Sequence, residues 1–147
     1  MNPSVVGPVR RNVLRAFYAV MAFGLASVVW PDILSPPAGM PLPGTVVHGL
    51  LGGVGVMALL GLRYPVRMIP LLLFELVWKV IWVVAYALPW WQSGHLSTGA
   101  AENLFQCAFG IILIPLVLPW RHVLHNYLAG PGEPWRGSTR ASAGYTD

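Results

Sequence analysis

Four long apolar segments most constrain the fold of this chain. They cover residues 13–30, 45–62, 68–89 and 104–120. Each is close to the ~20 residues that an α-helix needs to cross the hydrocarbon core of a bilayer. Backbone amides in that core must be satisfied within the protein, which favours helices over open strands. Because 56% of all residues are hydrophobic and only 10% are charged, an ordinary soluble domain is excluded. The sequence predicts an all-α membrane protein, a bundle of four transmembrane helices.

The arginines predict how this bundle lies in the membrane. They stand before or at the start of the first segment, between the second and third, and after the fourth, whereas residues 31–44 and 90–103 contain no lysine or arginine. By the positive-inside rule, both termini and the turn at 63–67 lie in the cytoplasm. We therefore expect a multi-pass protein of the inner (plasma) membrane. The net charge of +4 does not indicate a nucleic-acid partner, because the arginines end apolar segments and share no polar face.

The two ends of the chain need separate interpretations. The first segment resembles a signal peptide, but no small-residue cleavage site follows it, so we expect it to remain as a helix. After the fourth segment, residues 121–129 predict a short interfacial helix with apolar side chains toward lipid. A single transmembrane domain would thus cover residues 1–129. Residues 130–147 are mainly Gly, Pro, Ser and Thr, which is typical of a disordered tail, here cytoplasmic.

The third segment holds the only lysine of the chain, Lys79, one helical turn after Glu75. A charged side chain at mid-membrane costs at least ~2.5–3.5 kcal/mol on insertion scales, so such residues have a partner or a task. The four-residue spacing places both side chains on one helix face, where they can neutralise each other. Two interpretations remain open: a structural ion pair that fixes helix packing, and a direct role in a ligand or proton site.

Other polar or aromatic side chains fall at similar depths when residues are counted from the arginines at ~1.5 Å each. A shared polar core between the four helices is therefore predicted. On the third segment the spacing of 4, 3 and 4 residues extends the Glu75–Lys79 face to two aromatic residues. Glycines beside His48 and Gln106 leave room for a neighbouring helix. The candidate ligand-binding or proton-relay residues are Glu75, Lys79, His48, Gln106, Tyr18, Trp82 and Tyr86.

Each candidate also has a structural interpretation. For His48 an interhelical hydrogen bond is favoured over a titrating or metal-binding role, and for Gln106 helix association is favoured over ligand binding. Trp78 and Trp82 suit packing as well as cation–π contact with a buried cation. His122 and His125 lack a third ligand, so no metal site is predicted there. No known catalytic pattern is present, so no catalytic residue is assigned and enzyme activity is not favoured. The sequence does not identify a cofactor.

The glycine-rich run from His48 to Arg63, followed by Tyr64-Pro65 and a further apolar span, resembles the middle hairpin of the DoxX-like small membrane proteins. That resemblance covers about 40 residues and implies a four-helix membrane protein associated with redox or stress functions, often as a partner subunit. It does not extend to the Glu75–Lys79 pair. The four-helix small multidrug exporters match less well, because their membrane glutamate is in the first helix.

Two classes of function follow from these features. In the first, a polar core of Glu75, Lys79 and His48 binds a small or amphiphilic ligand, such as a lipid or quinone, or relays protons. In the second, the chain is a structural or accessory subunit of a membrane complex, with a membrane protein as its partner. An enzyme acting on a lipid or quinone is a third class. An accessible cavity that reaches Lys79 would favour binding, whereas a dry, sealed pair would favour a structural role.

Overall fold

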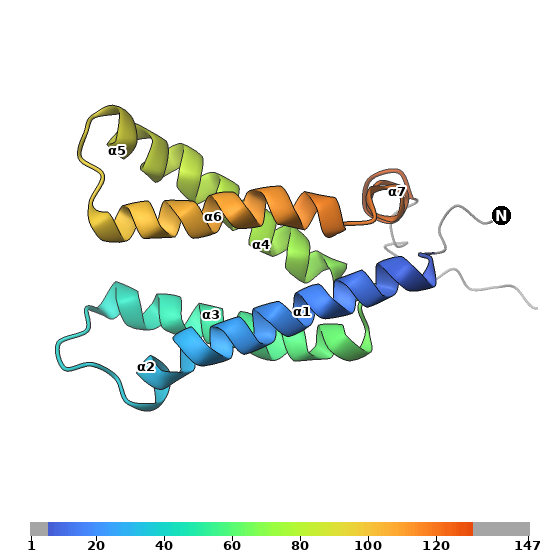
Figure 1. The fold of residues 1–147 in the computed structure, drawn as a ribbon, viewed down its shortest axis with the longest axis horizontal. Coiled ribbons are helices and arrows are strands. Elements are labelled where there is room, and N and C mark those ends of the chain that lie inside the picture. Colours follow the sequence, from blue (N-terminus) through green and yellow to red (C-terminus); the bar gives the residue numbers. More distant parts are fainter. Residues whose placement is uncertain (1–5, 131–147) are drawn as a thin grey trace, which may run out of the picture.

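The computed structural model describes residues 6–130, and every regular element in that range is helical (Figure 1). The elements in chain order are α1 (Pro8–Val28), α2 (Trp30–Leu34), α3 (Leu42–Arg63), α4 (Ile69–Trp82), the π-helical turn η1 (Val83–Ala87), α5 (Leu88–Gln92), α6 (Thr98–Val117), α7 (Trp120–Val123) and the π-helical turn η2 (Leu124–Leu128).

Three helices in the described part of the chain are long and apolar enough to cross a membrane: Leu42–Arg63, Ile69–Gln92 and Thr98–Val117. The second of these is the continuous run of α4, η1 and α5. The first predicted segment, residues 13–30, lies in α1 and the start of α2 and is not among the three. Although α1 has 21 residues, arginines in its first turns make it less apolar than the other long helices.

Proline and serine set several helix boundaries. A proline occupies one of the first two positions of α1, α3 and α4, where the missing N–H costs no helical hydrogen bond. Ser97 caps α6, since its hydroxyl accepts a hydrogen bond from the Ala100 amide at 3.3 Å. α6 therefore begins six residues before the predicted segment at Leu104. After Pro119, α7 and η2 occupy the region of the predicted short helix; the predicted tail, apart from Gly130, lies outside the described residues.

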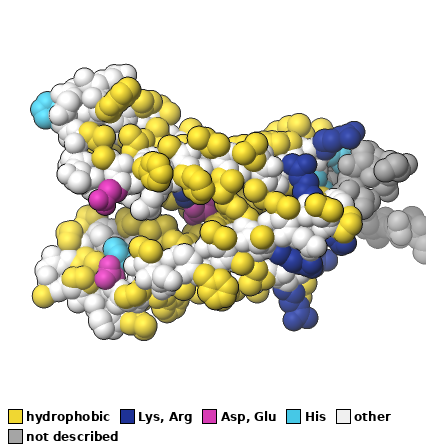
Figure 2. All heavy atoms as spheres, viewed as in Figure 1, with side chains coloured by type: hydrophobic (Ala, Val, Ile, Leu, Met, Phe, Trp, Pro, Cys, Tyr) yellow, Lys and Arg dark blue, Asp and Glu magenta, His cyan; other side chains and the backbone are white. Residues whose placement is uncertain are grey.

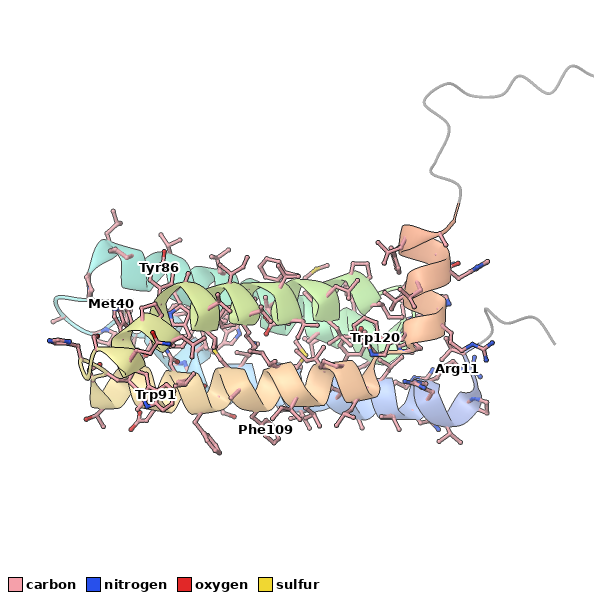
Figure 3. The ribbon with its side chains drawn as sticks, turned by 90° about the horizontal axis from the view of Figure 1, so that it is seen from above. Arg11, Met40, Tyr86, Trp91, Phe109 and Trp120 are labelled. Atoms are coloured by element: carbon pink, nitrogen blue, oxygen red, sulfur yellow. The ribbon has the colours of Figure 1, made fainter. Side chains whose placement is uncertain are left out.

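The long helices form two antiparallel pairs, α1 with α3 and α4 with α6 (Figure 1). Contacts between α1 and α6, and between α3 and α4, join the pairs. The two pairs spread apart toward the end of the molecule that carries α2 and α5, here named the α2–α5 end. In the view from above, Arg11 and Trp120 lie toward one end and Met40 and Trp91 toward the other (Figure 3).

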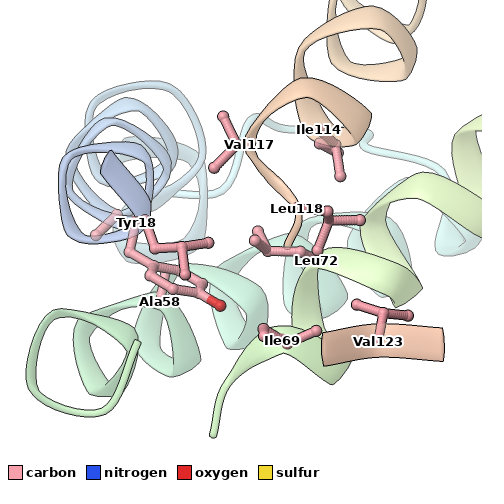
Figure 4. Close-up of a cluster of buried hydrophobic side chains, with 10 residues drawn as sticks. Tyr18, Ala58, Ile69, Leu72, Ile114, Val117, Leu118 and Val123 are labelled. Atoms are coloured by element: carbon pink, nitrogen blue, oxygen red, sulfur yellow. The ribbon is translucent and has the colours of Figure 1, made fainter. Parts of the chain in front are cut away.

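The hydrophobic core lies where the pairs meet, toward the end opposite α2 and α5 (Figure 1), and Figure 4 shows its side chains. Tyr18 of α1 is fully buried there, and its hydroxyl donates to the Pro65 carbonyl at 3.3 Å. Its ring packs directly on Gly61 of α3, where a Cβ would overlap the ring. The other main members of the core come from α1, α3, α4, α6 and α7 and from the link between the last two: Leu14, Ala58, Ile69, Leu72, Ile114, Leu118 and Val123.

Basic side chains gather at this same end, here named the arginine end (Figure 2). Two of them bond to carbonyls where helices finish: Arg10 Nη2 donates to Leu118 O at 2.6 Å, and Arg15 Nε donates to Leu62 O at 3.1 Å. Such bonds satisfy carbonyls that lack helical partners, and the positive charge complements the helix dipole. Two arginines of α1 therefore bind the C-terminal ends of α3 and α6.

Candidate functional site

The predicted ion pair on α4 is present, with Glu75 buried and Lys79 partly buried. Lys79 Nζ contacts Glu75 Oε2, one helical turn away. The indole N–H of Trp78 donates to the other carboxylate oxygen, Glu75 Oε1, at 3.0 Å. Glu75 is only 5% exposed. Both of its oxygens therefore have a donor, as a buried carboxylate requires.

The helix opposite makes room for the lysine. At Gly110 of α6, a Cβ would lie 2.9 Å from both Lys79 Cδ and Cε. The aliphatic part of Lys79 thus crosses α6 where no side chain blocks it. Its ammonium lies 4.1 Å from the centroid of the Trp78 ring, within the range of cation–π attraction. Gly110 therefore leaves room for Lys79. The sequence had suggested that it leaves room beside Gln106.

A pocket of about 360 Å3 reaches Glu75 of this pair, whereas Lys79, the residue that a binding cavity was expected to reach, is not in its lining. Its walls come from α3, α4 and α6, so it lies between the two helix pairs, and Figure 2 shows the surface hollowed between them toward the α2–α5 end. The volume is within the range of small-molecule sites, about 300–1,000 Å3. The lining is Val47, Leu50, Leu51, Val54, Phe74, Glu75, Trp78, Trp82, Asn103 and Cys107.

The aromatic continuation of the α4 stripe divides at the π-helical turn. Trp82 lines the pocket beside Glu75, as predicted, and its ring meets Trp90 edge-on at 6.5 Å. Tyr86 is 51% exposed and packs against Trp90, with ring centroids 5.9 Å apart. A π-helical turn is wider than an α-helical one, so it breaks the 4, 3, 4 spacing on which the stripe was predicted. Tyr86 therefore lies outside the cluster around Glu75.

His48 belongs to a second polar contact, away from the ion pair. Its Nε2 lies 3.2 Å from Asp32 Oδ2 and its Nδ1 lies 2.8 Å from the Gly44 carbonyl. Both partners are acceptors, so a ring protonated on both nitrogens satisfies both contacts. This arrangement joins α3 to the short helix α2 and includes Asp32, which sequence reasoning passed over. The signal was available, because Asp32 is the only acidic residue in its loop and precedes His48 by 16 positions.

The remaining two candidates also lie apart from the pair. Tyr18 is in the core near the arginine end, bonded to Pro65, and Gln106 is exposed on α6. The face of α6 that does meet α4 is the stripe of Asn103, Cys107 and Gly110. Its spacing of 4 and 3 equals that of Glu75, Lys79 and Trp82. The spacing of these residues could have identified this stripe. The prediction instead followed the polar side chain of Gln106, which lies on a different face of α6.

No group of three or more His, Cys, Asp or Glu side chains arranged to hold a metal ion occurs among residues 6–130. No family model, no curated protein and no solved structure matches this chain. The resemblance to the DoxX-like proteins therefore stays a prediction. What the site can do has to be argued from the pocket itself.

Proposed function

We propose that this chain is an integral protein of the inner (plasma) membrane that binds a small amphiphilic ligand in the pocket beside Glu75 and Lys79. In this proposal four helices span the bilayer, with both termini and the arginine end in the cytoplasm. Three spans are supported by length and hydropathy. The fourth, α1 with the start of α2, is supported by its antiparallel packing on α3 and by the segregation of the arginines.

The observation that carries the binding function is that the pocket reaches the buried carboxylate of Glu75. An ion pair that served only helix packing would gain nothing from an adjoining cavity. A void also lacks the van der Waals contacts that close packing supplies, so it weakens a bundle. A mainly apolar cavity with a few polar groups, here Glu75 and Asn103, is the usual form of a small-molecule site. A proton relay alone would require the polar group but no apolar volume around it.

A structural role for the pair is the second candidate, and one observation favours it. Both oxygens of Glu75 have donors, and the stem of Lys79 packs at Gly110 of the neighbouring helix. The pair thus links α4 to α6 whether or not a ligand binds. An accessory subunit of a membrane complex, with the pair serving packing, would need no more than this.

Retention of a ligand by the purified protein distinguishes these functions. Val54 lines the pocket from α3 and is 7% exposed, whereas Val56 on the same helix is 48% exposed and lies outside the lining. We expect native mass spectrometry of protein extracted from membranes to detect a retained small molecule. Val54→Phe should remove it and the matched control Val56→Phe should keep it. Equal retention by both variants would show that the molecule binds elsewhere, and none in any form would favour the structural role.

A further inference from the structure

The pocket presents a negative group and no positive one. Glu75 is the only charged side chain in the lining, and the lining contains no Lys, Arg or His. Lys79 contacts Glu75 but is not part of the wall. A carboxylate has about four acceptor positions, and two donors, Lys79 Nζ and Trp78 Nε1, are accounted for. Glu75 can therefore accept a further donor from the pocket side.

The aromatic side chains around Glu75 suit a cation as well. Phe74, Trp78 and Trp82 line the same cavity. The faces of such rings attract ammonium groups, most strongly for tryptophan and most where water is excluded. The protein already uses this chemistry, since the Lys79 ammonium lies 4.1 Å from the Trp78 ring centroid.

Charged side chains outside the pocket lining also favour a cationic ligand. Among residues 6–130 the arginines lie at the opposite end of the molecule, whereas acidic side chains appear on both sides of the hollow between the helix pairs (Figure 2). Glu102, next to the lining residue Asn103, is exposed on α6. His48 and Lys79 are each paired with one of the acidic groups, but the excess charge is negative. A cleft with an excess of one sign of charge and low-dielectric walls concentrates ligands of the opposite charge. An approaching cation would meet this field before it reached Glu75.

We propose that the ligand is an apolar monocation, an ammonium group on a hydrocarbon body. The inference rests on the binding function proposed above and specifies its chemistry. The ammonium lies against Glu75, Trp78 and Trp82, and the hydrocarbon body lies against the valine and leucine side chains of α3. Lys79 is then the internal cation that neutralises Glu75 when no ligand is bound, and a bound ligand shares the Glu75 carboxylate with Lys79.

Three probes with the same alkyl chain test this assignment: decylamine, decanol and decanoate. We expect isothermal titration in an uncharged maltoside detergent to show decylamine binding at least about tenfold more tightly than either other probe, a difference of about 1.4 kcal/mol. Glu75→Gln should abolish this preference. Glu102→Gln removes a charge outside the lining that adds to the negative field, so it should weaken decylamine binding by less than about threefold and keep the preference over the other probes, because an exposed charge is screened by salt.

Lys79→Met gives a second, opposite readout. It removes the internal cation, so decylamine should bind more tightly than to the wild type and should raise the melting temperature by a larger amount. If this variant does not fold, the wild-type titrations decide alone. Equal binding of all three probes, sensitive to Val54→Phe, would overturn the assignment to cations and leave the binding function in place. Binding of no probe above the level of Val54→Phe would overturn both.

Discussion

Removal of the Lys79 charge should strongly destabilise the protein, and the contacts of Glu75 set the size of the effect. Lys79→Met leaves the carboxylate of Glu75, which is 5% exposed, with the Trp78 indole N–H as its remaining hydrogen-bond donor. Breaking a buried ion pair by removing one partner costs roughly 3–5 kcal/mol. Methionine retains the aliphatic length that packs at Gly110, so the loss should come from charge and not from packing.

Two double variants divide this cost further. Glu75→Leu with Lys79→Met removes both charges but leaves the Trp78 N–H without an acceptor, which costs about 1–3 kcal/mol. Glu75→Gln with Lys79→Met removes both charges and keeps an acceptor for the indole. We expect the order of stability to be the Gln–Met double variant, then the Leu–Met double variant, then Lys79→Met alone.

Reversible unfolding in mixed micelles, followed by circular dichroism, gives the free energies of unfolding. Val80→Met, one residue along α4 and 39% exposed, is the matched control and should lie within about 0.5 kcal/mol of the wild type. If Lys79→Met is as stable as the wild type, Glu75 and Lys79 do not depend on each other. The account of the site would then fail at its first step.

Three further outcomes are expected. Gly61→Ala should lower the free energy of unfolding by about 1–3 kcal/mol, because its methyl group overlaps the Tyr18 ring. Gly49→Ala, with open space at its Cβ, should be neutral or stabilising by up to ~1 kcal/mol. Similar losses at both sites would contradict the packing of Tyr18 on Gly61. Asp32→Asn should cost less than about 1 kcal/mol, because the pair with His48 is partly exposed, and a larger loss in the same unfolding assay would mean that this pair holds the bundle together. With Cys107 replaced by serine, a cysteine at position 93 should react with an impermeant maleimide from outside intact cells and one at position 138 should not; the reverse pattern would refute the proposed orientation.

The helical architecture and the ion pair could be predicted from the sequence because both depend on local spacing. Long apolar runs leave the backbone little choice but helix in a membrane. Glu75 and Lys79 meet because they are four residues apart on one helix. The bond of Trp78 to Glu75, three residues apart, has the same local origin.

Contacts between helices could not be predicted from local spacing. Depth along a helix can be counted, but the direction in which a side chain points depends on how each helix is rotated against its neighbours. His48 and Gln106 lie at suitable depths, yet His48 meets Asp32 and Gln106 is exposed. Tyr86 was displaced by a π-helical turn that no residue pattern indicated. The pocket arises because the two helix pairs diverge, which is a property of the whole bundle.

The indole N–H resonances of the tryptophans test the central claim most directly. Trp78 donates to Glu75, and both Trp78 and Trp82 line the pocket, whereas Trp91 is 65% exposed and lies outside the lining. In nitrogen–proton correlation spectra, assigned by single tryptophan-to-phenylalanine variants, decylamine should shift the Trp78 and Trp82 signals with saturation and leave Trp91 nearly unchanged. Val54→Phe should abolish these shifts. Uniform shifts of all three signals, or saturable shifts that persist in Val54→Phe, would contradict a ligand site beside Glu75.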